Sequence, residues 1–133
     1  MRTASCSCGQ LRVSVEGEPA RVGICSCTQC QRRTGAAFAV GAFFPKTQIA
    51  AIDGTHKAFR RSSDAGRDVE YHFCPECGSS VFWYLDAAPQ LTAVAVGCFT
   101  DPAFPPPARV IWAAHKLNWV EFPPGVPVQN DQP

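Results

Sequence analysis

The chain has 133 residues, a length typical of one domain and sufficient to bury a real core. Its 12 basic and 11 acidic residues leave a formal net charge of +1, which gives no electrostatic basis for binding nucleic acid or an anionic membrane. The longest apolar run, residues 36–44, is too short for a membrane helix, which needs about 20 residues. We expect no signal region at the start of the chain, and therefore a cytoplasmic protein with reduced thiols.

Short strands separated by turn residues follow one another along the chain. Leu11, Val13 and Val15 alternate with polar residues, as in a half-buried strand. Residues 28–33 predict one short helical turn, which Gly35 ends. Apolar, aromatic and β-branched residues predict further strands over 21–25, 36–44, 48–52, 57–61, 68–73, 81–85, 91–99, 109–113 and, at an edge, 119–122.

These elements predict a mainly β fold with little helix, formed by a single domain. The 12 prolines and 10 glycines suit the many turns that such a fold needs. Proline, glycine and polar residues dominate the last stretch of the chain. We therefore expect the domain to span residues 1–122 and residues 123–133 to form a loose tail.

Eight cysteines fall into four groups: Cys6 and Cys8 in SCSCG, Cys25, Cys27 and Cys30 in CSCTQC, Cys74 and Cys77 in CPECG, and Cys98 alone. Disulfides are one explanation, but C-x-C and C-x-x-C clusters in a reducing compartment suit a metal better. The two pairs, each followed by a glycine, together supply the four thiolates of a structural zinc site. The three cysteines of CSCTQC, which we name the cysteine triple, remain for a second site.

Three protein ligands and one open position are typical of catalytic zinc. Cys98, His72 and His115 are the residues that could instead close the site. Cys98 is also explained as a small apolar core residue, since free cysteine behaves in this way. We expect His72 to be exposed on its strand and His115 to lie at the surface.

The charge of the cysteine triple favours a particular fourth ligand. Three thiolates on a divalent ion leave a net charge of −1, and such a soft site suits another sulfur better than it activates water. Arg32 and Arg33 follow the triple directly. They either hold a substrate carboxylate through paired hydrogen bonds or form an ordinary solvated basic patch.

The segments SCSCGQLRVSV, CSCTQCQRRTGAAF, HFCPECGSSVFW and WAAHKLNWVEF, in this order, resemble the glutathione-dependent formaldehyde-activating enzyme and centromere protein V family. The resemblance implies a domain of twisted antiparallel sheets over residues 1–122. It implies two Zn²⁺ ions per chain, whose ligands are Cys6, Cys8, Cys74 and Cys77 at the structural site and Cys25, Cys27 and Cys30 at the catalytic site.

The activity that the resemblance implies joins glutathione and formaldehyde to give S-hydroxymethylglutathione, a reaction classed with carbon–sulfur lyases. In this scheme the glutathione thiolate occupies the open zinc position and attacks the aldehyde carbon. The expected partner is therefore a small-molecule thiol, glutathione or one like it.

A zinc-containing protein- or nucleic-acid-binding module without catalysis is the alternative. Such ribbons need two cysteine pairs and usually a basic face. This chain has a surplus cysteine triple and almost no net charge, so we expect a zinc-dependent carbon–sulfur lyase-type enzyme that acts on the thiol adduct of an aldehyde. A thioredoxin-like redox C-x-x-C is disfavoured because the βαβ context is missing.

Overall fold

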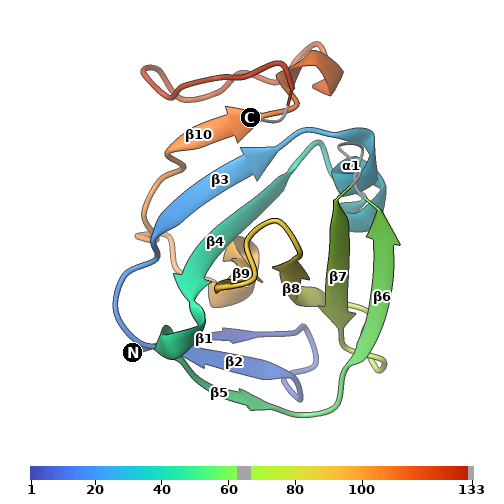
Figure 1. Cartoon of the computed structure of the whole chain (residues 1–133), viewed down its shortest axis with the longest axis vertical. Helices are drawn as coiled ribbons and strands as arrows, with labels where there is room; N and C mark the ends of the chain where they lie inside the picture. The colour runs from blue at the N-terminus through green and yellow to red at the C-terminus, as the bar shows by residue number, and fades with distance from the viewer. Residues whose placement is uncertain (63–66, 132–133) are drawn as a thin grey trace.

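A computed structural model describes residues 1–62 and 67–131 as two packed β-sheets with few helical turns (Figure 1). The strands are β1 (Arg2–Ser5), β2 (Arg12–Val15), β3 (Arg21–Cys25), β4 (Ala39–Pro45), β5 (Ile49–Asp53), β6 (Lys57–Ser62), β7 (Asp68–Phe73), β8 (Ser80–Leu85), β9 (Leu91–Ala95) and β10 (Arg109–Ile111). The helical elements are α1 (Thr28–Thr34), η1 (Lys46–Gln48), η2 (Val96–Phe99) and η3 (Ala113–His115). The mainly β fold with little helix is confirmed. None of the described helices is long and apolar enough to cross a membrane.

The small sheet has the strand order β1-β2-β5, and the large sheet has the order β10-β3-β4-β9-β8-β7-β6. Neighbouring strands pair antiparallel, as expected, with one exception. Strand β10 runs parallel to β3, with Val110 opposite Ile24. The chain reaches this position through the proline-rich crossover before β10, where the Ala108 amide donates to the Val22 carbonyl at 2.8 Å.

The main core lies between the two sheets. Leu11, Val13 and Val15 of the small sheet are fully buried there, which confirms the alternation seen in the sequence. They belong to the same apolar cluster as Phe44 and Phe82 of the large sheet. Burying one such side chain contributes on the order of 2 kcal/mol, so this interface holds the sheets together.

Three local expectations were wrong. The predicted strand over 91–99 ends at Ala95, and η2 follows, because the helical turn carries Phe99 into the core against the Phe44 ring. Residues 119–122 form no strand, and Trp119 is 74% exposed. Strand β1 was not expected, because Ala4 is its only buried residue and a single small side chain makes no alternation.

The segment expected to be a loose tail is described as far as Asp131, and it lies beside β10. Val128 bridges Val110, whose amide donates to the Pro127 carbonyl at 2.9 Å and whose carbonyl accepts from the Gln129 amide at 2.8 Å. These contacts cover the outer edge of β10. The division of the chain after residue 122 stays a prediction.

The second face of the large sheet carries a separate apolar cluster around Trp83, next to Phe82 in sequence but on the opposite face of β8. Small residues leave this face hollow: Gly23 pairs with Gly41 across β3 and β4. A Cβ on Gly41 would lie 2.8 Å from Cζ2 of Trp83, closer than carbon atoms tolerate. Glycine at this position therefore lets the indole ring pack closely against β4.

Gly41→Ala should lower the free energy of unfolding by about 1–3 kcal/mol, because the indole ring must move out of its packed position. Gly97→Ala is the matched control, since a Cβ there meets no atom within 4 Å. Thermal unfolding of both variants checks this expectation. Equal melting temperatures would contradict the close packing of Trp83 against β4.

Candidate metal centres and active site

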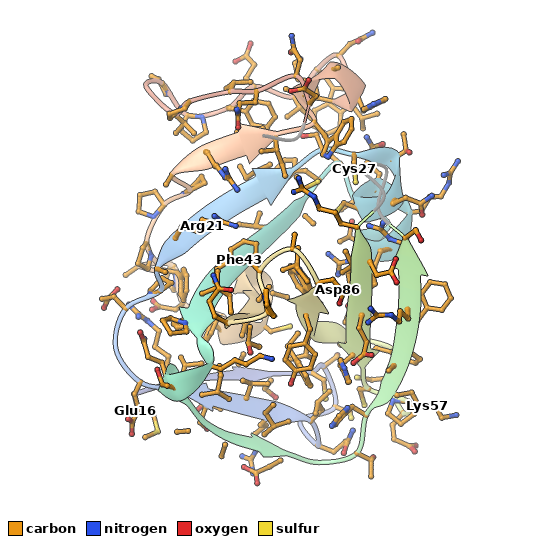
Figure 2. The ribbon with its side chains drawn as sticks, in the orientation of Figure 1. Glu16, Arg21, Cys27, Phe43, Lys57 and Asp86 are labelled. Atoms are coloured by element: carbon orange, nitrogen blue, oxygen red, sulfur yellow. The ribbon has the colours of Figure 1, made fainter. Side chains whose placement is uncertain are left out.

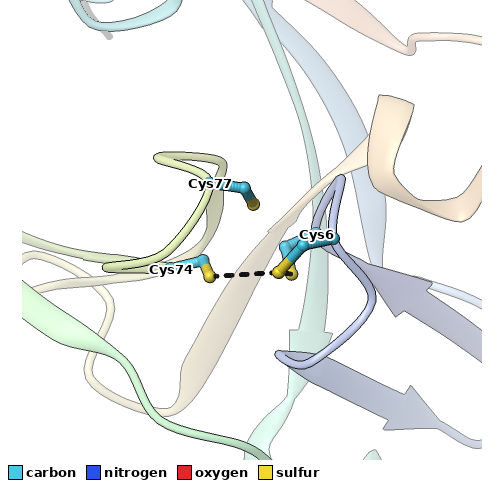
Figure 3. A group of neighbouring side chains, drawn as sticks. Cys6, Cys74 and Cys77 are labelled. Atoms are coloured by element: carbon cyan, nitrogen blue, oxygen red, sulfur yellow. Dashed lines mark hydrogen bonds between the residues drawn. The ribbon is translucent and has the colours of Figure 1, made fainter.

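Cys6, Cys8, Cys74 and Cys77 form one cluster, in which all four Sγ atoms lie within 4.8 Å of one another. Figure 3 shows the sulfurs of Cys6, Cys74 and Cys77 directed toward a common point from two turns. One turn follows β1 and the other follows β7, so the cluster joins the small sheet to the large sheet. Glycines in the left-handed region, Gly9 (φ 85°) and Gly78 (φ 79°), end both turns.

Hydrogen-bond donors surround these sulfurs. The side-chain amide of Gln10 donates to Sγ of Cys74 at 2.9 Å, and the Leu11 amide donates to Sγ of Cys6 at 3.3 Å. The Ser79 hydroxyl lies 3.4 Å from Sγ of Cys77 and, by donating to it, lowers the pKa of this thiol to about 5. Three of the four converging sulfurs thus have donors that stabilise a thiolate, and a set of four cysteines fits a tetrahedral zinc ion.

The cysteine triple forms the second cluster, and its three Sγ atoms also lie within 4.8 Å of one another. Cys25 ends β3, Cys27 is the N-cap of α1, and Cys30 lies in the first turn of this helix. Sγ of Cys27 accepts a hydrogen bond from the Cys30 amide at 3.3 Å, so a thiol takes the capping role usually played by a hydroxyl or carboxylate. The strand end and the helix start therefore bring the three thiols together.

The environment of the triple favours negative charge on one sulfur, that of Cys27, while the pKa values of Cys25 and Cys30 are raised. Hydrogen bonds from the Cys25 and Cys30 thiols, together with backbone amides at the start of α1, lower the pKa of Cys27. Cys27 and Cys30 are only 5% and 8% exposed. Three converging thiols, two of them buried and Cys25 partly buried, suit a metal such as zinc, which binds deprotonated cysteine and offsets the repulsion between the thiolates.

The residues that could have closed the second site lie elsewhere, and within the described chain only the three cysteines make up this cluster. Cys98 packs partly buried against the main core, as expected for a small apolar residue. His115 is exposed, as expected. The expectation for His72 was wrong: it is 8% exposed and stacks on Phe82, because the large sheet is covered on both faces at β7.

A cavity of about 100 Å³ opens beside the cysteine triple, on the hollow face of the large sheet. All three cysteines line it. Apolar walls come from five different strands and from the segment after β10, and the residues involved are Ile24, Phe43, Val69, Trp83, Leu85, Ile111 and Trp112. A small organic molecule in this cavity would therefore meet sulfur at one end and apolar surface along its sides.

The two arginines that follow the triple have different positions. Arg33 lines the cavity, and its guanidinium carbon lies 4.5 Å from the Tyr71 ring centroid and 4.6 Å from that of Trp83. One guanidinium nitrogen also donates to the Ser80 hydroxyl at 3.1 Å. Arg32 is exposed and does not line the cavity. The structure thus brings Arg33, but not Arg32, together with the cysteine triple.

Tyr71 places a phenol in the same cavity. A guanidinium nitrogen of Arg61 donates to the Tyr71 hydroxyl oxygen at 2.6 Å. Burial, followed by the nearby Cys30 charge, raises the pKa of Tyr71 above its ordinary value. The phenol is therefore protonated at neutral pH, and because its oxygen accepts from Arg61, its own proton is available for another acceptor.

The segment after β10 forms the remaining wall. Trp112 has a left-handed backbone (φ 57°), a strained state for a bulky residue, and its side chain packs against the cysteine triple. The side-chain amide of Gln31 in α1 donates to the carbonyls of Ser26 and His115, both at 2.9 Å. The Gln31 amide therefore connects α1 to η3 and keeps the segment after β10 next to the cysteine triple.

The model of the glutathione-dependent formaldehyde-activating enzyme family matches residues 1–115. The chain belongs to this family. A crystal structure of a Rhodobacter sphaeroides protein from a structural genomics programme has a similar fold, with a TM-score of 0.58 and 18% sequence identity. The match covers 96% of this chain and 98% of that protein.

Several cavity residues of this family member were not singled out in the sequence. Tyr71, Trp83, Arg61 and Trp112 lie on separate elements, and nothing in the local pattern joins them to the cysteines. Face alternation was the available signal, since Tyr71 pairs with Trp83 on adjacent strands. Alternation alone does not show which residues share the cavity, because this also depends on the order of the strands in the sheet, which the sequence did not show.

Protein purified without chelators should contain close to two zinc ions per chain, because the structure has two clusters of converging thiols. Metal analysis by mass spectrometry checks the ratio. The cysteine triple has fewer ligands and should lose its ion first under mild chelation. A stable ratio near one would remove the second zinc site.

The two clusters should differ in their effect on folding. Cys77→Ser should strongly destabilise the protein, since structural zinc contributes on the order of 10 kcal/mol to the folding of small domains. Cys30→Ser should retain the fold, because main-core packing does not pass through the triple. Thermal unfolding and zinc content of both variants test this, and equal destabilisation would contradict the division of roles.

Proposed function

We propose that this protein is a zinc-dependent carbon–sulfur lyase-type enzyme acting on the adduct of an aldehyde with a glutathione-like thiol. Membership of the formaldehyde-activating family supports an enzyme that works with glutathione on formaldehyde. In this proposal the four-cysteine cluster holds a structural zinc, and the cysteine triple holds a catalytic zinc in a cytoplasmic protein.

One observation carries the proposal: three converging thiols, with no fourth ligand among the described residues, line a cavity that also contains a cation and a phenol. A purely structural zinc site takes four protein ligands and needs no cavity. Zinc at the triple would supply one further position, and its sulfur-rich environment suits a substrate thiolate there.

The reaction balances without an oxidant or reductant. In the direction of synthesis, the thiol first loses its proton, a lone pair of the resulting thiolate forms a C–S bond to the aldehyde carbon, the C=O π pair moves to oxygen, and that oxygen takes up one proton. Breakdown of the adduct reverses each change. The polar groups of the site therefore have to supply a proton and stabilise developing negative charge on oxygen.

Tyr71 is placed to supply this proton. Its hydroxyl oxygen already accepts from Arg61, and its raised pKa keeps the phenol protonated at neutral pH. Arg33 adds a fixed positive charge, since Tyr71 and Trp83 hold its guanidinium in place. The apolar side chains of the cavity limit water around the reacting atoms, which strengthens both interactions.

Cobalt substitution tests whether the position beside the triple is open. Cobalt–thiolate charge-transfer absorbance grows with each bound sulfur, so glutathione and 2-mercaptoethanol, titrated separately, should each raise it in a saturable way. Cys30→Ser should abolish the response, and the four-cysteine cluster should contribute no change.

If the cobalt spectrum shows two four-sulfur sites and no thiol alters it, the enzyme proposal is wrong and the non-catalytic binding module is favoured. A response to 2-mercaptoethanol but not to glutathione would preserve thiol chemistry and exclude glutathione as the substrate. The two thiols therefore separate the site from its ligand.

A further inference from the structure

The face of β3 that lines the cavity has a cysteine at one end and an arginine at the other. Alternate residues share this face, in the order Arg21, Gly23, Cys25. Figure 2 shows Arg21 beside Phe43 on the neighbouring strand, at the opposite end of β3 from Cys27. Phe43 and Gly23 both line the cavity, so the hollow extends from the thiols toward Arg21.

A second arginine lies at this far end. Arg109 of β10 pairs with Gly23 and lines the cavity. Burial, followed by the positive charge of Arg109, lowers the pKa of Arg21. Two like charges therefore face each other where strands β3 and β10 meet, and this arrangement is unfavourable unless an anion joins them.

No protein anion fills this role within the described part of the chain. Neither Arg21 nor Arg109 forms an ion pair with a described carboxylate, in contrast to Arg2 and Arg60. Nε of Arg21 is buried and has no hydrogen-bond partner. Its guanidinium stacks on the Phe43 ring at 4.6 Å, which fixes its position but leaves its donors unused.

Among the described residues that line the cavity, the one acidic side chain, Asp68, already has partners. A carboxylate oxygen of Asp68 lies 3.3 Å from Nε of Arg60, and the other carboxylate oxygen accepts from the Ser62 hydroxyl at 3.0 Å. Arg60 also forms ion pairs with Glu70 and Asp86, so these carboxylates already have a cationic partner. The other charged side chains described along the cavity are arginines.

We propose that Arg21 and Arg109 form an anion subsite, which binds a carboxylate of the thiol substrate at the end of the cavity opposite the cysteine triple. Two guanidinium groups match a carboxylate through paired, charge-assisted hydrogen bonds. The subsite deepens the proposed function and rests on it, because it assigns the far end of the ligand whose sulfur is bound at the triple.

The spacing selects the size of this ligand. Four residue-to-residue steps along β3 lead from Arg21 to Cys25, about 13 Å at 3.3 Å per step, and the long arginine side chain shortens the gap. A fully extended tripeptide spans about 10 Å, and since the thiol of glutathione is on the central residue, about half of this length lies between the cysteine residue and a terminal carboxylate; the arginine side chain spans the rest of the gap. A thiol of short-peptide size with a terminal carboxylate therefore reaches both ends, whereas a small neutral thiol reaches only the cysteines.

The test compares charged and uncharged thiols. Arg109→Gln should weaken glutathione binding about tenfold in the cobalt protein, as expected for the loss of one charge-assisted contact. Binding of uncharged 2-mercaptoethanol should change less than twofold. Arg109→Lys should recover part of the loss, and Arg21→Gln should behave like Arg109→Gln if circular dichroism shows it folded.

Arg12→Gln is the matched control, since it removes the same charge from an exposed position on the small sheet. Glutathione affinities that are equal in Arg12→Gln and Arg109→Gln would overturn the subsite. Raised salt should also weaken glutathione binding more in the wild-type protein than in Arg109→Gln.

S-methylglutathione separates this proposal from the proposed function, because it keeps both carboxylates and offers no thiolate. Calorimetry should show that it binds the wild-type protein and binds Arg109→Gln about tenfold more weakly. If this holds while no thiol alters the cobalt spectrum, the catalytic zinc proposal fails and the anion subsite stands. If neither S-methylglutathione nor glutathione binds the wild-type protein, the anion subsite is overturned.

Discussion

The junction between the two sheets is the constraint on which the rest of the structure depends. It is made by the apolar interface around Leu11 and Phe82 and, at one edge, by the four-cysteine cluster. The cluster joins a turn after β1 to a turn after β7, so one bound ion would connect segments that are distant in sequence. Once the small sheet covers one face of the large sheet, the other face is left to build a cavity.

The cavity follows from side-chain size along the strands. Glycine and alanine line the centre of the hollow face, and Trp83 and Tyr71 stand beside them. The aromatic rings then hold Arg33 next to the cysteine triple through cation–π contacts, which strengthen where water is excluded. Packing thus supplies both the space for a ligand and the fixed charge that faces it.

Charge is distributed unevenly around this site. Arg60 collects Asp68, Glu70 and Asp86, while Arg21, Arg33 and Arg109 have no carboxylate partner in the described chain. The net charge of +1 does not reveal this uneven distribution, because it adds together positive and negative charges that lie far apart in the fold. A positive cavity beside three thiols also offsets the negative charge that those thiols acquire when they ionise.

The sequence alone determined the mainly β class, most strand positions and both cysteine clusters. Period-two alternation and C-x-x-C spacing are local patterns. Because Cys27 and Cys30 are only three residues apart, a single turn already brings their sulfurs close together. Tertiary structure alone decided that β10 runs parallel to β3, that η2 replaces the end of a strand, and that His72 is buried. It alone also placed Arg33, Tyr71 and Arg109 around one cavity, with Arg21 beside it on the Phe43 ring. The physical reason is that strand order and the covering of each face arise from contacts between distant segments, and these leave no periodic trace in either segment by itself.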